Sequence, residues 1–454
     1  MIIFAIAVSA WIFVDPPNGL SAQAFHMAII FVATMAGIML EVCDSITLLF
    51  LGLIFLNLSS TLDIKQNFTG FSNMVPWLLF SILSLAHVLT KTTLGLRIAY
   101  LFMRHFGKNI TGLSYSIILT ELVIAPAMPS STARTASVGF PLVTSLSKYI
   151  SSNYHGVSEK TIGVYLLVLY SACCSICSAA YATGMISNAL VLDAMSTAGL
   201  QVTWLSWIKF TIIPCLVLLL ILPFVVRIVC NPKVKNLEHI KEQAAANYKQ
   251  LGAMTRREKS IVVIFVAMLL MWVFSGTTGI PILVTALIGI CTFLILKILD
   301  LKEILSISST FNAVIILGLL ISYVNGLISL GVIDWFSGFI SQSVGSFGNV
   351  TAFLALTTIY FFAHYFFSGE GGRIVALYAP FLATGLSLGM GGEVVSMTLA
   401  VFSSMSNVLT HYTSPVSILM FSSGYITAQK WATSGLILSA VILSVWYLYI
   451  CFVM

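Results

Sequence analysis

The sequence predicts an all-α protein that crosses a membrane many times. Of its 454 residues, 59% are hydrophobic and 8% are charged, and the mean hydropathy is +1.03. A soluble domain carries roughly 25% charged residues. The 21 basic and 15 acidic side chains of this chain therefore cannot cover a water-facing surface. Its apolar runs are continuous rather than alternating, which favours membrane helices over a membrane barrel.

Apolar runs separated by polar, glycine or proline residues give the order of the predicted helices. A crossing needs about 20 apolar residues, so the length allows on the order of 10 to 14 crossings. Several runs are too short to cross alone, which predicts helices that break inside the membrane. The first run lacks a basic segment and is predicted to be a short membrane helix rather than a cleaved signal peptide. The runs lie near residues 2–14, 25–40, 45–58, 75–89, 110–128, 162–181, 206–230, 260–274, 280–299, 312–330, 350–367, 374–390, 394–405 and 432–453.

Positive charge is concentrated in one polar loop, where seven of the 21 basic residues lie between Asn231 and Lys259. The positive-inside rule puts this loop in the cytoplasm, so the net charge of +6 reports orientation and gives no reason to expect a nucleic-acid partner. The loop also divides the chain into two halves. The predicted segments are N-terminal helices over 1–70, a first repeat over 71–230 with a hairpin tip near 129–134, the basic loop over 231–259, linking helices over 260–310, and a second repeat over 311–454 with a tip near 368–373.

The two halves carry matching residues in the same order. Shifts of 227, 239 and 241 residues align them, and the small differences between shifts are typical of insertions in a duplicated unit. Membrane carriers are often built from two such repeats with inverted topology. The matches are Thr183 with Thr410, Ser187 with Ser414, Trp204 with Trp431, Arg134 with Arg373, Pro141 with Pro380, and Phe106-Gly107 with Phe347-Gly348.

Each half contains one segment that enters the membrane without an uninterrupted apolar helix. These segments are Ala125–Arg134 and Phe367–Arg373. Unwound backbone at membrane depth is tolerated only against protein or a water-filled cavity. The free N–H groups and positive dipole of helix ends favour an anion, and Ser and Thr hydroxyls add donors. We therefore predict two re-entrant helical hairpins, one in each repeat, whose tips bind an anionic substrate.

Four motifs make the sequence similar to a known family. They are Phe71-Ser-Asn-Met-Val-Pro-Trp-Leu, Leu122-Val-Ile-Ala-Pro-Ala-Met-Pro-Ser-Ser-Thr-Ala-Arg134, Ala182-Thr-Gly-Met-Ile-Ser-Asn188 and Leu409-Thr-His-Tyr-Thr-Ser-Pro415. From about Trp11 to the C-terminus the chain resembles the divalent anion:sodium symporter family. It is most similar to the bacterial and plastid exchangers for citrate, tartrate, succinate, malate and 2-oxoglutarate.

The resemblance implies a homodimer in a lipid bilayer, expected to be the bacterial inner membrane. It also implies an elevator mechanism, in which a scaffold holds the dimer while a transport domain with two hairpin tips slides across. Family members bind carboxylates through a Ser-Asn-Thr motif at each tip and through a broken helix in each repeat. The matching residues here are Ser130, Ser131 and Thr132 in the first tip, Gly369, Glu370 and Gly371 in the second, Thr183 and Asn188 in the first broken helix, and Thr410, His411, Thr413 and Ser414 in the second. The altered second tip puts its binding of an ordinary dicarboxylate in doubt.

Two arginines at matching places suggest how a dianion is balanced. Arg134 and Arg373 each lie two positions beyond a tip motif, and the exchangers resembled here carry a basic residue there. A buried dianion needs cations, because an unpaired charge at membrane depth is costly. We expect both arginines to bind the substrate in place of sodium, so no cofactor is expected. The alternative is that each arginine pairs with an acid, Glu121 for the first and Glu370 for the second.

Two further expectations concern single residues. A buried Glu370 would titrate, which keeps proton coupling open. Trp204 and Trp431, at the start of two long apolar spans, are predicted to anchor those spans at the membrane surface.

The leading function is therefore exchange of di- or tricarboxylates by a secondary carrier, and the chain is not expected to be an enzyme. Sodium- or proton-coupled symport is the alternative within the same class. A membrane-embedded enzyme is a distant alternative, because the sequence lacks a His-Glu-x-x-His metal motif, a phosphate loop and a nucleophile elbow. A channel is disfavoured by two unlike tips with buried arginines. Which anion is carried stays open, because carboxylic acids that differ by one hydroxyl are separated by side-chain placement.

Overall fold

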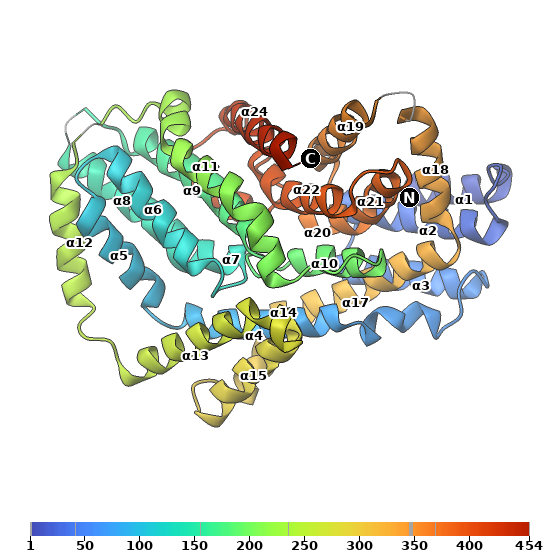
Figure 1. Cartoon of the computed structure of the whole chain (residues 1–454), viewed down its shortest axis with the longest axis horizontal. Helices are drawn as coiled ribbons and strands as arrows, with labels where there is room; N and C mark the ends of the chain where they lie inside the picture. Colours follow the sequence, from blue (N-terminus) through green and yellow to red (C-terminus); the bar gives the residue numbers. More distant parts are fainter. Residues whose placement is uncertain are drawn as a thin grey trace. The chain divides into compact units, whose positions relative to one another are not determined.

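The computed structural model describes residues 2–40, 42–154, 156–234, 236–344, 348–367 and 369–453. Helices make up the regular structure of these ranges, which contain no β-strand, so the predicted all-α class is confirmed (Figure 1). The matched Phe347 and the tip residue Ser368 lie outside the described residues, as does Lys235 of the basic loop.

The chain forms two compact units, and each unit is built from three separated stretches of sequence. Unit 1 consists of Met1–Phe80, Ala189–Gln201 and Leu305–Leu399, and unit 2 of Ser81–Asn188, Val202–Ile304 and Ala400–Met454. The units are therefore interleaved along the chain, and each predicted repeat contributes to both.

Unit 1 holds the N-terminal helices and the second hairpin. Its α-helices are α1 (Ile2–Phe13), α2 (Ala22–Met39), α3 (Ser45–Leu58), most of α10 (Asn188–Thr197), α17 (Ser308–Ser329), α18 (Val332–Val344), α19 (Asn349–Phe362), α20 (Glu370–Arg373), α21 (Ala379–Ser387) and the start of α22 (Gly392–Met405). Short turns of other helix types are η1 (Gln66–Ser72), η3 (Ala363–Phe366) and the π-helical η4 (Ile374–Tyr378).

A close backbone approach in unit 1 joins η1 to α17. Gly70 N–H donates to Ser322 Oγ at 3.0 Å, and Ser322 Oγ in turn donates to the Gly318 carbonyl at 3.0 Å. A Cβ added at Gly70 would overlap the Gly318 carbonyl oxygen and lie 2.7 Å from Ser322 N. Only glycine fits at this crossing, which explains why the apolar pattern is interrupted there.

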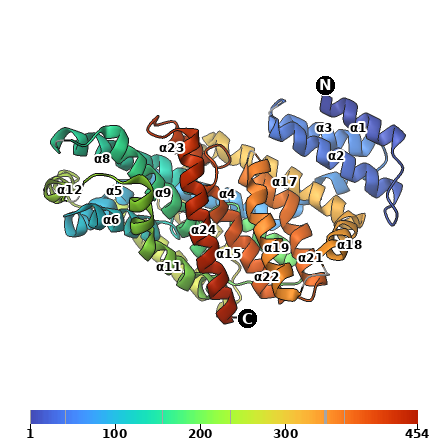
Figure 2. The same cartoon turned by 90° about the horizontal axis from the view of Figure 1, so that it is seen from above.

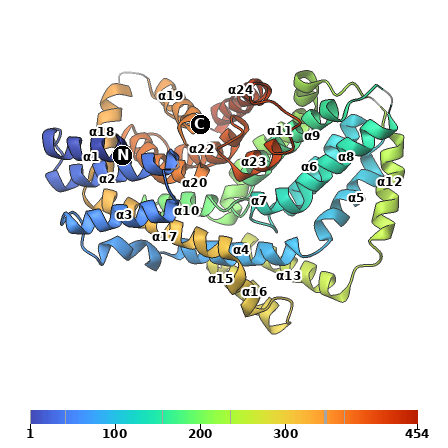
Figure 3. The ribbon, with the colours of Figure 1, turned by 180° about the vertical axis from the view of Figure 1, so that it is seen from behind.

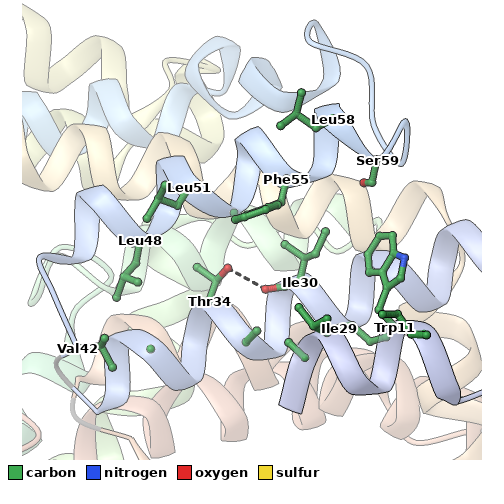
Figure 4. Close-up of a pocket in the computed structure, with 16 residues that line it drawn as sticks. Trp11, Ile29, Ile30, Thr34, Val42, Leu48, Leu51, Phe55, Leu58 and Ser59 are labelled. Atoms are coloured by element: carbon green, nitrogen blue, oxygen red, sulfur yellow. Dashed lines mark hydrogen bonds between the residues drawn. The ribbon is translucent and has the colours of Figure 1, made fainter. Parts of the chain in front are cut away.

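An apolar groove of about 550 Å³ is formed by α1, α2 and α3. Trp11, Ile30, Leu51 and Phe55 line it, and the Thr34 hydroxyl is turned back onto the Ile30 carbonyl at 2.7 Å (Figure 4). A groove with so few polar groups suits the hydrocarbon of a bilayer and not water. The N-terminal run expected to be a short membrane helix is α1 itself.

Unit 2 holds the first hairpin, the basic loop and the C-terminal helix. Its α-helices are the end of α4 (Met74–Thr90), α5 (Leu94–Phe106), α6 (Ile110–Ile124), α7 (Ser131–Arg134), α8 (Phe140–Asn153), α9 (Glu159–Ala180), α11 (Trp204–Cys230), α12 (Glu238–Gln250), α13 (Arg256–Val273), α14 (Ser275–Thr278), α15 (Ile282–Ile295), α23 (Pro415–Phe421) and α24 (Ala428–Val453). Unit 2 also contains the π-helical η2 (Thr135–Gly139) and the 3-10 helix η5 (Ser406–Val408). Along the sequence, unit 2 ends and unit 1 resumes within α16 (Leu301–Ser306).

The central helix of unit 2 is α9, whose most apolar stretch of 18 residues is 94% buried. It packs against α11, and α24 lies along α11 (Figure 2). The corresponding 18-residue stretches of α11 and α24 are only 39% and 33% buried. Ile213, Leu220 and Ile228 of α11 are 57%, 59% and 83% exposed, so this apolar surface requires lipid around it.

Fewer helices are long enough to span a bilayer than the length of the chain allows. Within the described residues, four helices are long and apolar enough to cross a bilayer. The pair η1 and α4, which is bent by 44°, makes a fifth span if it is counted as one. Further apolar helices are shorter: Ala22–Ile38, Ser45–Leu58, Ile110–Ile124 and Ile282–Ile295. The difference arises because the chain unwinds inside several apolar runs, as the short runs predicted.

The basic loop is ordered by one buried ion pair. The loop helix α12 packs on α5 (Figure 3), and Arg97 of α5 donates to the carbonyls of Gly252 and Leu251 at 2.7 and 2.8 Å. Arg97 Nε also lies 3.3 Å from Glu258 Oε1. Burial alone would raise the pKa of Glu258, but hydrogen bonds from Thr93, the Thr255 N–H and Arg97 outweigh it and lower the pKa to about 2.

Replacing Gly70 with Ala should lower the free energy of unfolding by about 1–3 kcal/mol, because the new Cβ forces η1 away from α17. The measurement is the melting temperature of the purified protein in detergent. The control is Gly338→Ala in α18, where an added Cβ meets nothing within 4 Å. Equal melting temperatures for the two variants would show that the crossing is not tight.

Glu258→Gln should cost about 1–3 kcal/mol at pH 7, since it removes a charged hydrogen-bond acceptor. The folded pKa is about 2 and the ordinary value is 4.5. The stability from ionised Glu258 is therefore complete above pH 4.5 and is lost as the pH falls toward 2. Melting temperatures measured from pH 7 to pH 3 should converge for wild type and variant. Glu242→Gln, whose side chain is 80% exposed, should have no effect at either pH. A constant gap between Glu258→Gln and wild type would contradict the assignment.

Candidate functional site

The first hairpin tip forms where the predicted break lies. Helix α6 ends at Ile124, the chain turns through Pro126 and Pro129, and helix resumes at Ser131. Proline ends a helix because it lacks an N–H donor. Ser130 caps the new helix, since its Oγ accepts from Ala133 N at 3.2 Å. In this tip Ser130 is buried, Ser131 is half-buried and Thr132 is exposed.

Arg134 ties the tip to its surroundings and is fully buried. Its Nε donates to Glu121 Oε1 at 2.6 Å. Its Nη1 donates to the carbonyls of Met128 and Gly184 at 2.6 and 2.8 Å, and its Nη2 donates to Ser178 Oγ at 2.8 Å. One side chain therefore satisfies a carbonyl of the tip and a carbonyl of the broken helix that follows α9.

The charge of Arg134 is balanced inside the protein. Glu121 of α6 carries the opposing charge, and its second oxygen accepts from Tyr170 OH at 3.1 Å. We expected Arg134 to face the substrate, but its donors face protein acceptors. This geometry favours the alternative in which the arginine pairs with an acid.

The first broken helix lies between α9, which ends at Ala180, and α10. Thr183 Oγ1 donates to the Pro126 carbonyl of the tip at 3.3 Å. Asn188 Nδ2 donates to the carbonyls of Ser178 and Tyr181 at 3.0 and 2.9 Å. Asn188 Oδ1 is buried and has no hydrogen-bond partner among the described residues. The break therefore offers one acceptor oxygen that fits a cation or a donor rather than a carboxylate.

The second broken helix lies beside the first tip in unit 2. Helix α22 ends at Met405, η5 follows, and α23 begins at Pro415 and packs against α7 and η2. The hydroxyls of Thr410 and Thr413 hydrogen bond to each other, and Ser414 Oγ accepts from Val416 N at 3.3 Å. The half-buried ring of His411 packs on Phe421 with 4.3 Å between ring centroids.

The prediction that Trp204 and Trp431 anchor spans at the membrane surface is wrong. They are 3% and 4% exposed. Trp204 Nε1 donates to Thr183 Oγ1 at 3.2 Å, and Trp431 Nε1 donates to the Val408 carbonyl at 3.2 Å. Each indole satisfies the unwound backbone or side chain of its own repeat's broken helix, where no water is available to do so.

The second hairpin tip, in unit 1, repeats the local structure of the first at a spacing of 239 residues. A four-residue α-helix, a five-residue π turn and a further α-helix begin at Ser131, Thr135 and Phe140 in the first copy, and at Glu370, Ile374 and Ala379 in the second. The helices before the tips, α6 and α19, begin at Ile110 and Asn349, again 239 apart. The duplication inferred from a few matched residues therefore extends to the helix boundaries.

The two arginines have different neighbours. Arg373 is fully buried and lies over the ring of Tyr360, with 5.2 Å from Cζ to the ring centroid. Its Nη1 also reaches the Tyr360 carbonyl at 3.5 Å. Tyr360 stands 239 residues after Glu121, so the second copy has an aromatic ring where the first has a carboxylate. A ring face attracts a cation without cancelling its charge.

Unit 2 brings together the first tip and both broken helices. The ten predicted residues in it are Ser130, Ser131, Thr132, Arg134, Thr183, Asn188, Thr410, His411, Thr413 and Ser414. Gly369, Glu370, Gly371 and Arg373 belong to unit 1. Sequence reasoning missed the roles of Ser178, Gly184 and Tyr170, which surround Arg134. The shift of 239 residues aligns Glu121 with Tyr360, so the sequence contains this difference between the repeats. Its meaning became clear only when the structure showed that Arg134 contacts Glu121.

Comparison with known proteins identifies the family. The profile of the sodium:sulfate symporter transmembrane region matches residues 1–453. The chain belongs to this family. The predicted family is thereby confirmed, and with it an integral membrane transport protein rather than an enzyme.

Named relatives cover nearly the whole chain. "Putative malate transporter YflS" of Bacillus subtilis is 34% identical over 447 residues, covering 98% of this chain and 93% of its own. "Dicarboxylate transporter 2, chloroplastic" of Spinacia oleracea is 31% identical, covering 95% of this chain and 78% of its own. The "Citrate/succinate antiporter" of Escherichia coli is 27% identical, covering 97% and 94%.

Solved structures support the fold alone. MtrF of Neisseria gonorrhoeae, described as an antimetabolite efflux pump, matches with a TM-score of 0.59 and 14% identity, over 99% of this chain and 97% of its own. The YdaH transporter of Alcanivorax borkumensis has a TM-score of 0.59 and 12% identity, over 94% and 97%. These two transporters thus share the helical fold of this chain.

Glu121→Gln should lower the free energy of unfolding by about 3–5 kcal/mol, because Arg134 keeps a buried charge and loses its counter-charge. Unfolding of the purified protein in detergent measures this. Ser178→Ala is the control, because it removes a neutral acceptor of Arg134 and leaves the Glu121 carboxylate in place, so it should cost less. The ion-pair assignment fails if Glu121→Gln is as stable as wild type or as Ser178→Ala.

Proposed function

We propose that the chain exchanges di- or tricarboxylates such as succinate, malate, 2-oxoglutarate, tartrate or citrate across a bacterial cell membrane. The names of the relatives support a carboxylate cargo, and the antiporter among them supports exchange. The observation that carries the site is the packing of α23 on α7 and η2, which brings two hydroxyl-rich breaks together within unit 2.

The first tip has the chemistry to bind one carboxylate. The helical run that α7, η2 and α8 form together starts at Ser131, so its free N–H groups and positive dipole end point out of the tip. Thr132 is exposed at this end, and His411 is half-buried in the second break. A carboxylate that accepts from these donors gains charge-assisted hydrogen bonds.

The two arginines are proposed to have separate roles. Arg134 positions the tip, because Glu121 already cancels its charge and its other donors hold carbonyls of the tip and of the first break. Arg373 is proposed to contact the cargo, because it is fully buried and lies in the first helical turn after the second tip. A site that keeps buried positive charge crosses the membrane poorly when empty, which favours exchange over net uptake.

Assembly and motion are proposals from the family resemblance. Two copies are proposed to form a homodimer through scaffold helices, while a transport domain with both tips and both broken helices slides as an elevator. The inverted orientation of the repeats belongs to this proposal, as do the scaffold helices over 1–70 and 260–310.

Sodium-coupled symport is the second candidate, and one observation favours it. Asn188 Oδ1 is a buried acceptor without a partner in the described part of the chain, and Asn188 Nδ2 donates to the carbonyls of Ser178 and Tyr181 at the same break. An amide oxygen and backbone carbonyls are hard ligands of the kind that alkali and alkaline-earth cations take. If sodium binds, Asn188 is the residue proposed to hold it. Proton coupling through Glu370 is a further proposal, and the pH dependence of transport by wild type and Glu370→Gln tests it.

Counterflow in sodium-free liposomes tests the function. Unlabelled succinate inside should accelerate uptake of labelled succinate several-fold, since each inward step requires an outward anion. Uptake that needs an inward sodium gradient and no internal anion would establish symport instead.

A variant of the tip makes the test specific. Thr132→Val should raise KM for the anion by about 10- to 100-fold, the cost of one hydrogen bond to a charged group. Thr433→Val, another exposed threonine but outside the site, should leave KM unchanged. Equal KM values for the two variants would place the carboxylate elsewhere.

A further inference from the structure

Unit 1 contains a cavity of about 340 Å³ that the proposed transport site does not use. Its walls are formed mostly by three helical segments. Residues 190, 193, 194 and 197 come from α10, and Ala198 follows that helix; residues 321, 324, 325 and 328 come from α17, and residues 374, 375, 379, 382, 383 and 386 from η4 and α21. Ile333 of α18 completes the lining. A spacing of three and four residues is that of one helix face.

The cavity is apolar except at one end. Thirteen of its sixteen lining residues are aliphatic, and the polar ones are Asp193, Thr197 and Asn325. Asp193 and Asn325 each lie four residues before the last residue of their helix, so both are close to where α10 and α17 end. Asp193 is the one charged residue among those that line the cavity in the described structure.

The carboxylate of Asp193 has one hydrogen bond to protein. Its Oδ1 accepts from Asn73 Nδ2 at 2.8 Å, and Asn73 Oδ1 in turn accepts from Val75 N at the start of α4. Asn325 Nδ2 donates to Thr69 Oγ1 at 3.1 Å. Within the described ranges Asp193 forms no ion pair, and its Oδ2 has no hydrogen-bond partner.

Asp193 is half-buried, so its carboxylate lies at the edge of the apolar cavity and not deep inside the protein. A cation with an alkyl part can pair with this carboxylate and place its apolar atoms against the aliphatic walls. The volume and the aliphatic walls match those of sites for small organic ligands, which combine apolar lining with a few polar groups. At about 30 Å³ for a water-sized group, the space holds about ten non-hydrogen atoms.

We propose that this cavity is a second ligand site, which binds a small organic cation with an aliphatic body. The ammonium group pairs with Asp193 and receives further acceptor contacts from Asn325 and Thr197, while the alkyl part packs against Ile321, Ile328 and Leu382. Anions such as the proposed cargo are excluded by the same carboxylate. The site therefore differs from the transport site in the sign of charge that it selects.

A ligand in this cavity would contact the segments η4 and α21, which form one of its walls, and this affects the second tip. Segments η4 and α21 continue directly from the second tip, whereas α17 and α10 form the opposite walls. A ligand that contacts all three segments holds them in one arrangement. It is expected to slow transport without competing with the anion, if the second tip has to move.

The test uses purified full-length protein in a non-ionic detergent and hexylammonium chloride as the probe. An alkylammonium is charged at pH 7, as a lysine side chain is. At tenfold excess over Kd it should raise the melting temperature of the wild type by about 2 °C or more. Hexanol and hexanoate, which have the same chain without the positive charge, should give no such rise.

Two variants and a matched control complete the experiment. Asp193→Asn keeps an acceptor for Asn73 and should abolish the shift, and Ala383→Leu should reduce it by filling the cavity. Asp334→Asn, an exposed acid of α18, should keep the full shift. The proposal is overturned if hexanol shifts the wild type as much as hexylammonium does, or if Asp193→Asn retains the shift. The readout is stability, so this outcome is independent of whether the chain exchanges carboxylates.

Discussion

The satisfaction of backbone groups where the chain unwinds inside a bilayer is the constraint on which the rest of this structure depends. Peptide groups that leave a helix at membrane depth have no water to bind, so protein donors must replace it. In unit 2 one guanidinium does much of this, because Arg134 holds Met128 of the tip and Gly184 of the neighbouring break. Trp431 donates to the Val408 carbonyl in the same way, and Trp204 donates to the Thr183 hydroxyl of the first broken helix. These fixed donors hold the breaks in one ordered arrangement.

The two copies of the hairpin keep the same backbone and differ in charge. Helix starts, π turns and the arginines all recur after 239 residues. Glu121 and Tyr360 occupy equivalent positions, so Arg134 contacts a carboxylate where Arg373 contacts a ring face. Duplication thus preserved the backbone of the hairpin, while the side chain that contacts each arginine changed.

Much of the fold was predictable, and particular residues explain where prediction stopped. The composition requires membrane helices, and Pro126, Pro129 and the glycines near Arg373 forecast the breaks. The expectation that Trp204 lies at the membrane surface was wrong because tryptophan at a span end is ambiguous. An indole N–H serves equally well at a lipid headgroup or against a buried Thr183 hydroxyl. The pairing of Arg134 with Glu121 was an open alternative, since thirteen residues and a turn separate them along the chain.

The sequence by itself determined the class of protein, the family, the basic loop and the segments that leave the helix. These depend on composition, local pattern and resemblance, which need no contacts between distant residues. Tertiary structure alone decided that stretches from three parts of the chain form each unit, that α23 lies against the first tip, and that Asp193 faces an aliphatic cavity. The reason is that the role of a side chain follows from its neighbours in space, and those neighbours are far away in the sequence: Asn73 and Asp193 are 120 residues apart, and Thr69 and Asn325 are 256 apart.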